Sequence, residues 1–170
     1  MRDYDVLIHA IEAAWAESSY SEEVHRALSV YTAHPEEQEA RGLFRGRHWE
    51  DISDAVLLAN CPNPFLIAGP AFRYYLPAFM IAAIRHRDEM FFEEVLGHLT
   101  LPKKPEAVAR FYAKFEGLSG NQKKAVALFL ETVRDIEFPR DQWGVQDKYH
   151  ERWVRRIDRS LHGYWEKEVS

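Results

Sequence analysis

Apolar residues recur along the first part of the chain at the three- and four-residue spacing that places side chains on one face of an α-helix. This pattern predicts a helix over residues 4–16, with an apolar stripe formed by Val6, Leu7, Ala10, Ile11, Ala14 and Trp15. Ser19 followed by Glu22 has capping-box spacing, which predicts a second helix over residues 20–33. The apolar stripe of that helix consists of Val24, Ala27, Leu28 and Tyr31. Pro35 then suits the first turn of a third helix, where its missing N–H costs nothing.

The middle of the chain contains the most apolar predicted helix, over residues 70–86. It is apolar nearly all round, so we expect it at the centre of the fold, with a kink at Pro77. Asp88 is suited to cap the next helix, whose inward residues are expected to be Met90, Phe91, Val95 and Leu99. A further helix is predicted over residues 105–115, beginning at a proline.

The C-terminal part contains two more helical patterns. Ser119 and Gln122 form a second capping-box pair, which opens a helix to residue 136 with the core positions Ala125, Val126, Leu128, Phe129, Leu130 and Val133. A last helix over residues 146–162 is expected to bury Tyr149, Trp153, Ile157 and Leu161. Because no run alternates as a strand would, we predict an all-α fold, a single compact domain of seven to nine helices around the Pro-kinked helix. Residues 139–170 are predicted to be a C-terminal helical extension packed on this domain.

Composition adds a cellular context to this prediction. The chain has 170 residues, the size of one domain, and its only cysteine, Cys61, cannot form an internal disulfide, which fits a reducing compartment. Asp3, Asp5 and Glu12 interrupt the first apolar stretch, so the start does not resemble a signal peptide. No apolar run has the length of a membrane span. We therefore expect a cytoplasmic protein without a membrane partner.

Charge is unevenly distributed along the chain. Residues 1–40 hold nine acidic residues against two arginines, a balance of −7, whereas residues 41–87 hold six arginines against three acidic residues, a balance of +3. The acidic part is either a solvated helix surface or a surface for a protein partner, with Glu22, Glu23, Glu36, Glu37 and Glu39 as the candidate residues. The net charge of −5 argues against nucleic-acid binding, although the last helix carries a basic face formed by Arg152, Arg155, Arg156 and Arg159.

The sequence shows no catalytic motif and no set of metal ligands. It has neither an HExxH motif nor a phosphate-binding glycine loop, nor a GxSxG elbow, and one cysteine excludes a thiolate zinc site. Glu94 and His98 lie one helical turn apart and could supply two ligands, which is too few for a metal site. We therefore predict no catalytic residue, no metal and no cofactor.

Two segments combine arginines with large aromatic residues, at positions 44–49 and 72–79. One interpretation is an anion or carboxylate pocket formed by Arg45, Arg47, His48, Arg73 and Tyr74. The other is a structural one, in which the arginines hold aromatic side chains and stabilise the fold. The sequence leaves both interpretations open.

The same segments carry a resemblance to a family of small bacterial proteins of unknown function. The resemblance rests on Ile11-Glu12-Ala13-Ala14-Trp15, on the FRGxxW turn over residues 44–49 and on the AFRYYLPAY-type helix that begins at Pro70. It covers residues 5–135, including a late helix over residues 118–133, and implies a helical bacterial domain without an assigned activity. The chain differs from the family pattern where residues 24–35 look helical and in the arginine-rich tail after Pro139.

Two hypotheses about function follow. The first is a non-catalytic protein-binding domain, for example an immunity-type inhibitor of a toxin, that uses the acidic N-terminal part. The alternative is a small anionic-ligand binding protein or enzyme that uses the arginine, histidine and tyrosine cluster. Trp49, Trp143 and Trp165 are further candidates for aromatic anchors at an interface.

Overall fold

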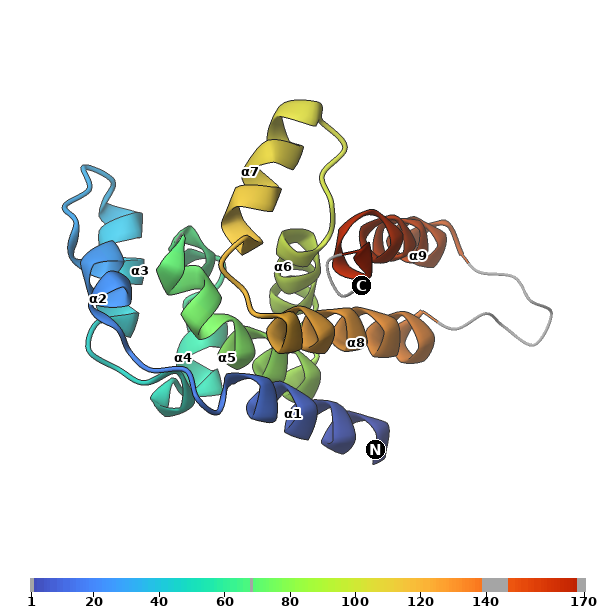
Figure 1. Cartoon of the computed structure of the whole chain (residues 1–170), viewed down its shortest axis with the longest axis horizontal. Helices are drawn as coiled ribbons and strands as arrows, with labels where there is room; N and C mark the ends of the chain where they lie inside the picture. Colours follow the sequence, from blue (N-terminus) through green and yellow to red (C-terminus); the bar gives the residue numbers. More distant parts are fainter. Residues whose placement is uncertain (1, 68, 139–146, 168–170) are drawn as a thin grey trace.

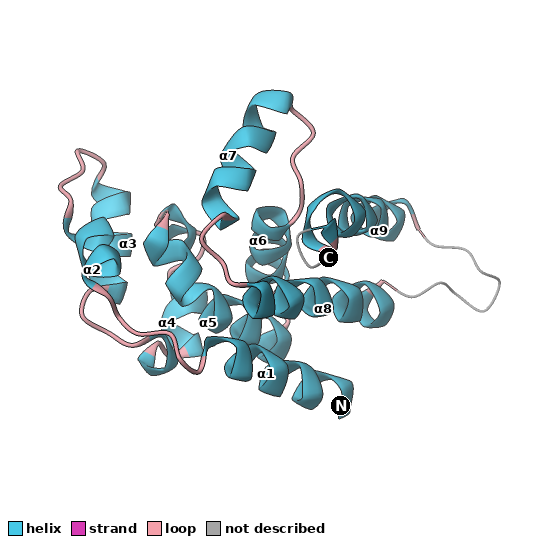
Figure 2. Ribbon diagram, in the orientation of Figure 1, coloured by secondary structure: helices cyan, strands magenta, loops and turns pink. Residues whose placement is uncertain are grey.

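The fold consists of helices joined by short loops (Figures 1 and 2). A computed structural model describes residues 2–67, 69–138 and 147–167, and these residues contain no strand. The described helices are α1 Arg2–Trp15, α2 Glu22–Ser29, α3 Pro35–Phe44, α4 Asp54–Ala59, α5 Pro70–His86, α6 Glu89–Leu99, α7 Pro105–Phe115, α8 Gly120–Glu137 and α9 Lys148–Ser160. Shorter turns are η1 Trp49–Asp51, η2 Asn63–Leu66 and η3 Leu161–Trp165. The predicted all-α single domain is thereby confirmed.

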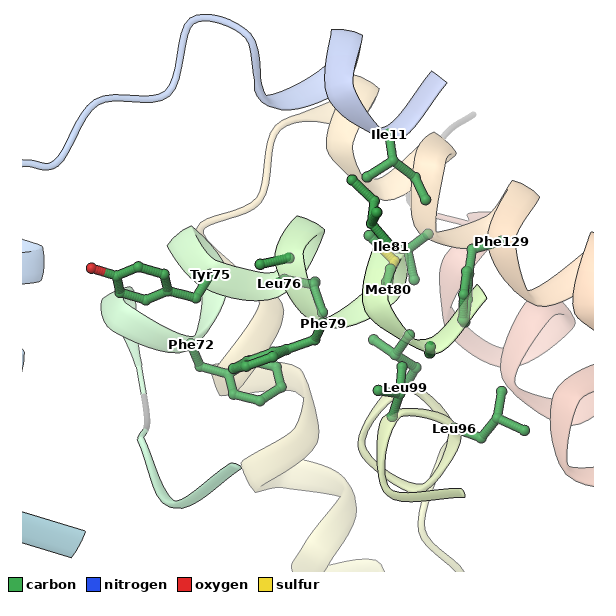
Figure 3. Packing of buried hydrophobic residues seen from close by; sticks show 14 of the residues in the cluster. Ile11, Phe72, Tyr75, Leu76, Phe79, Met80, Ile81, Leu96, Leu99 and Phe129 are labelled. Carbon is green, nitrogen blue, oxygen red and sulfur yellow. The ribbon is translucent and has the colours of Figure 1, made fainter. Parts of the chain in front are cut away.

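Helix α5 is the centre of the molecule, as its apolar sequence predicts. From Ala71 to Ile84 only Arg73 is not fully buried. Figure 3 shows Ile11 of α1 and Phe129 of α8 meeting the part of α5 that carries Met80 and Ile81. Helix α5 therefore contributes side chains to the core on all of its faces.

Helices α1 and α8 lie side by side across one face of α5 (Figure 1). The capping box predicted for α8 is present, because Ser119 Oγ accepts from the Gln122 N–H at 3.2 Å and Gln122 Oε1 accepts from the Ser119 N–H at 3.0 Å. Helix α1 covers α8 incompletely: Val6 is 67% exposed and Leu128 is 37% exposed. The expectation that these two residues are core was wrong, because the apolar stripes are wider than the surface that neighbouring helices cover.

The C-terminal helix folds back onto the domain. Helix α9 packs against α8, and Arg134 of α8 forms an ion pair with Asp158 of α9 at 2.8 Å. The π-turn η3 then places Trp165 in the core, where its indole N–H donates to the Leu99 carbonyl at 2.9 Å. Trp165 and Trp49 are buried, so neither is an exposed anchor, while Trp143 lies outside the described residues. Tyr149, expected to be buried, is instead partly exposed beside Glu93.

The second helix is shorter than predicted. Helix α2 ends at Ser29, and Val30 is extended with φ −64° and ψ 130°. Three consecutive residues with weak helix propensity, Val30, Tyr31 and Thr32, follow the last helical residue. Tyr31 therefore lies outside α2 and is not part of the apolar stripe that its spacing predicted.

Candidate functional site

The loop between α2 and α3 exposes two large apolar side chains. Tyr31 is 82% exposed and Val30 is 55% exposed. Figure 1 shows this loop at the outer edge of the molecule, at the far end from α9. We call residues 30–34 together with the first two turns of α3 the α2–α3 tip.

Side chains from α3 hold this loop in place. Arg41 donates to the Val30 carbonyl, and Arg45 donates to the Leu28 carbonyl at 2.8 Å. Thr32 Oγ1 donates to Glu37 at 2.8 Å and accepts from the His34 N–H at 3.3 Å. The two arginine bonds occupy main-chain carbonyls at the end of α2 that have no partner within the helix. The exposed Tyr31 is therefore carried on a loop with a fixed conformation.

The acidic residues proposed for partner binding divide into two groups. Glu36 and Glu39 are exposed on α3, close along the chain to Tyr31, and belong to the tip. Glu37 is turned towards Thr32 and Arg41, so it stabilises the loop. Glu22 and Glu23 are exposed at the other end of α2.

The charge of Glu22 is already paired within α2. Its carboxylate forms an ion pair with Arg26 at 2.9 Å, one helical turn away, and both side chains are largely exposed. Of the five acidic candidates, Glu36 and Glu39 are therefore the ones that combine exposure with proximity to the exposed aromatic residue.

The two arginine–aromatic segments meet, through aromatic side chains and through a tyrosine hydroxyl that bonds to the main chain. The Tyr75 hydroxyl lies 2.7 Å from both the Phe44 carbonyl and the Arg47 carbonyl, so it holds the turn that leads to η1. The Gly46 N–H donates to the Tyr20 hydroxyl at 2.9 Å. Gly46 has a φ of +75°, a conformation that favours glycine in this turn.

The arginines of the predicted anion pocket bond to different helix ends. Arg45 bonds to the last turn of α2, whereas Arg73 donates to the Lys114 carbonyl of α7 at 3.1 Å. The Arg73 guanidinium also lies against Gly117, where a Cβ atom would be 2.7 Å from its Nε. These contacts favour the structural interpretation for Arg45 and Arg73, whose guanidinium groups each bond to a carbonyl near the end of a helix.

The remaining candidates of this cluster are aromatic contacts. His48 lies edge-on to Tyr74 with ring centroids 5.7 Å apart, and its Nδ1 accepts from the Glu50 N–H at 3.3 Å. Tyr74 is buried, and burial raises the pKa of its hydroxyl. Arg47 is exposed.

A cavity of about 240 Å³ lies beside this turn. Its lining carries more negative than positive charge and consists of Glu12, Trp49, Glu50, Ile52, Asp54, Ala78, Ile81 and Arg85. Asp54 is paired with His86 at 2.8 Å and with Arg85 at 3.6 Å. None of the five residues of the predicted anion pocket lines this cavity.

A half-buried histidine and a half-buried lysine form the pair with the most strongly shifted pKa values. Lys114 Nζ lies 2.8 Å from His98 Nδ1 and 3.6 Å from the centre of the Phe72 ring. Burial lowers the pKa of Lys114 to about 7, and burial together with the charge of Lys114 lowers the pKa of His98 to about 3. Sequence patterns do not indicate Lys114, because its partners come from two other helices.

The described residues provide no evidence for a metal or a reactive thiol. They contain no group of three metal-ligating side chains. Burial and, secondarily, Glu94 raise the pKa of the Cys61 thiol to about 11, which keeps it protonated and weakly nucleophilic. No described helix combines the length and the apolar character needed to span a membrane.

Comparison with known proteins places the chain in a family. The model of a family of unknown function, DUF6714, matches residues 4–169. The chain belongs to this family. The match extends beyond the resemblance over residues 5–135, so the C-terminal helix belongs to the DUF6714 domain as well. Neither a curated protein nor a solved structure matches the chain.

Among the described residues of this DUF6714 domain, Tyr31 is the most exposed large aromatic residue, although its spacing had placed it in an apolar stripe. Helical spacing alone assigned Tyr31 to the stripe of α2. The signal against this assignment was local: Val30, Tyr31 and Thr32 are poor helix formers, and they stand between Ser29 and the helix-starting Pro35.

Proposed function

We propose that this protein is a non-catalytic binding protein whose α2–α3 tip docks onto a basic surface of a protein partner. The observation that carries the proposal is Tyr31, 82% exposed on an ordered loop. Tyrosine is enriched among residues that dominate binding energy, because it supplies a large rigid contact area with few rotatable bonds. Three hydrogen bonds order the loop that carries this side chain, and we infer that an exposed aromatic residue on an ordered loop serves binding.

The conformation of the tip supports tight binding. A loop that is already ordered loses little conformational entropy when a partner binds. Arg41 and Thr32 supply this order through contacts beneath the loop, which leaves the outer faces of Val30 and Tyr31 accessible.

Charge supports a basic partner. Residues 17–39 contain six acidic residues and one arginine, a balance of −5. Glu36 and Glu39 place two of these charges on the first two turns of α3, close along the chain to the exposed apolar pair. Complementary charge around an apolar contact accelerates association and selects against acidic surfaces.

An immunity-type inhibitor is the form of this activity that we favour. A toxin directed at nucleic acid carries a basic surface, and an acidic domain that covers that surface blocks it. We place this activity in the bacterial cytoplasm, where a free Cys61 remains reduced.

Comparative affinity capture from the host lysate tests the proposal. The experiment compares four tagged proteins at low and at high salt. They are the wild type, Tyr31→Ala, the double variant Glu36→Gln/Glu39→Gln and the control Met90→Ala. Met90, which helical spacing had placed inward, is an exposed apolar residue at the start of α6, away from the tip. We expect to capture one partner protein, whose recovery falls by about tenfold or more with Tyr31→Ala. Its recovery should also fall with the double glutamine variant and at high salt, and it should be unchanged with Met90→Ala.

Recovery of the same proteins by the wild type and by Tyr31→Ala would contradict the proposal. So would a captured protein that depends equally on Met90. Circular dichroism of each variant separates lost binding from lost folding, and since Tyr31 is mostly exposed, its replacement should leave the melting temperature unchanged.

A further inference from the structure

A continuous apolar groove runs along the outer surface between α1 and α8. At one end it is a depression of about 320 Å³ lined by Val6, Leu7, Leu128, Thr132, Asp135 and Ile136. At the other end it is a depression of about 280 Å³ lined by Ala10, Ala13, Ala14, Asn121, Lys124, Ala125 and Leu128. Leu128 belongs to both, so the two depressions form one groove.

The two ends of the groove are both depressions, and they differ in the side chains that line them. Val6 stands out from one end with 67% of its surface exposed. The small side chains of Ala10, Ala13 and Ala14 leave the other end hollow. When a second copy is turned by half a rotation, the exposed valine of each copy meets the alanine-lined depression of the other.

The two ends also have opposite charges on α8. Lys124 lies at the alanine-lined end and Asp135 lies at the Val6 end, and both are exposed. Asp135 also pairs with the neighbouring Arg134 at 2.8 Å, so the partner's Lys124 would share this carboxylate. Lys124 and Asp135 are eleven residues apart, which is three helical turns or about 16 Å along the same face of the helix. Leu128 lies between them on this face.

A two-fold axis near Leu128 matches all of these features at once. It runs the two α8 helices antiparallel, so that the Val6 end of each copy covers the hollow end of the other. Val6 then enters the alanine-lined hollow, and Lys124 of one copy faces Asp135 of its partner, twice in each dimer. A two-fold contact requires this kind of self-complementary surface.

We propose that the groove between α1 and α8 is the interface of a symmetric homodimer, in which the second copy is the occupant. The interface forms a bundle of four helices, two from each protomer. This inference does not rest on the proposed function, because the α2–α3 tip lies beyond the C-terminal end of α1 and lines no part of the groove (Figure 1).

Charge exchange tests the interface with the full chain. Sedimentation is measured over a wide concentration range for wild type, Val6→Asp, Lys124→Glu, Asp135→Lys and the control Lys148→Glu, which changes an exposed lysine of α9. We expect wild type and the control to dimerise, and Val6→Asp to weaken dimerisation by about tenfold or more. Val6 is mostly exposed in the monomer, so this variant keeps its fold.

The decisive sample is a mixture of Lys124→Glu and Asp135→Lys. Each variant alone places like charges opposite each other at both contacts and should remain monomeric. In the mixture, the two substituted side chains face each other at one contact, and the unchanged Asp135 and Lys124 face each other at the second. Both contacts then join opposite charges, so a heterodimer should form with about the wild-type affinity. A wild-type protein that stays monomeric, a dimer that the charge changes do not affect, or a mixture that forms no heterodimer would each overturn the proposal.

Discussion

The hydroxyl group of Tyr75 donates to the main-chain carbonyl of Phe44 at 2.7 Å, across 31 positions of sequence. The two rings also pack together, with centroids 4.6 Å apart. The contact joins the central helix α5 to the end of α3. Helix α3 carries the side chains that hold the α2–α3 tip, so Tyr75 connects the core to the proposed binding surface.

Tyr75→Phe should therefore destabilise the protein by about 1–3 kcal/mol, because it leaves a buried carbonyl without its donor. The measurement is the free energy of unfolding in urea. Tyr112→Phe is the matched control, since its hydroxyl bonds to the Gly163 carbonyl at an exposed position. A Tyr75→Phe variant as stable as Tyr112→Phe would contradict the role given to this hydroxyl.

Gly117 and Arg73 should behave as a coupled pair. An added Cβ at Gly117 would lie 2.7 Å from Arg73 Nε, so Gly117→Ala displaces the guanidinium and breaks its bond to the Lys114 carbonyl. We expect a loss of about 1 kcal/mol in the free energy of unfolding, and a smaller loss when Arg73→Met is already present.

Gly97→Ala provides the control for this pair. Gly97 is in α6 and an added Cβ there has no neighbour within 4 Å, so alanine should stabilise the helix by about 1 kcal/mol. Additive effects of Gly117→Ala and Arg73→Met would show that the guanidinium does not pack on this glycine.

Acid should destabilise the protein through His98. Its folded-state pKa is lowered to about 3, while the unfolded chain binds the proton near the ordinary value of 6.5. Between these values the unfolded state holds more protons, so the free energy of unfolding decreases as pH falls from 6.5 towards 3. His98→Gln removes this titration and should give a shallower dependence on pH.

Urea unfolding at several pH values, from about 7 to about 4, tests this dependence. His9→Gln, which replaces an exposed histidine of α1, is the control and should preserve the difference between the pH values. An unchanged pH dependence in His98→Gln would contradict the assignment of the lowered pKa to His98.

The capping box of α8 should contribute to stability. Ser119→Ala removes the hydroxyl that accepts from the Gln122 N–H, and we expect a loss of about 1 kcal/mol in the free energy of unfolding. Ser53→Ala, at the start of the short helix α4, offers a comparison because Ser53 also accepts a main-chain N–H at its helix start, from Val56. Equal stability of Ser119→Ala and wild type would show that the box is dispensable.

Local signals in the sequence were sufficient for the helices with clear ends. Ser119 and Gln122 located the start of α8, and the apolar run from Pro70 located α5, because capping and burial depend on residues close in sequence. The predicted C-terminal end of α2 was wrong, because apolar spacing does not show where a helix ends. Helical spacing extended the stripe to Tyr31, although the chain leaves the helix after Ser29.

The candidate site depends on contacts that sequence analysis could not supply. Arg45 bonds to Leu28 because α3 packs on α2, and Arg73 bonds to Lys114 because α7 lies near α5. These partners are far apart in sequence, so local sequence patterns do not predict the contacts. The exposure of Val6 likewise depends on how much of α1 its neighbours cover. Composition indicated the acidic character of the first 40 residues, but only the structure separates Glu36 and Glu39 from the inward Glu37.

Site-specific photocrosslinking tests the proposed binding surface most directly. A benzophenone amino acid replaces Tyr31 in one sample and Met90 in a second, and both are irradiated in the host cell. We expect one dominant adduct from position 31 that weakens when Glu36→Gln and Glu39→Gln are introduced, and no such adduct from position 90. No adduct at position 31, or the same adducts from both positions, would contradict the binding role of the α2–α3 tip.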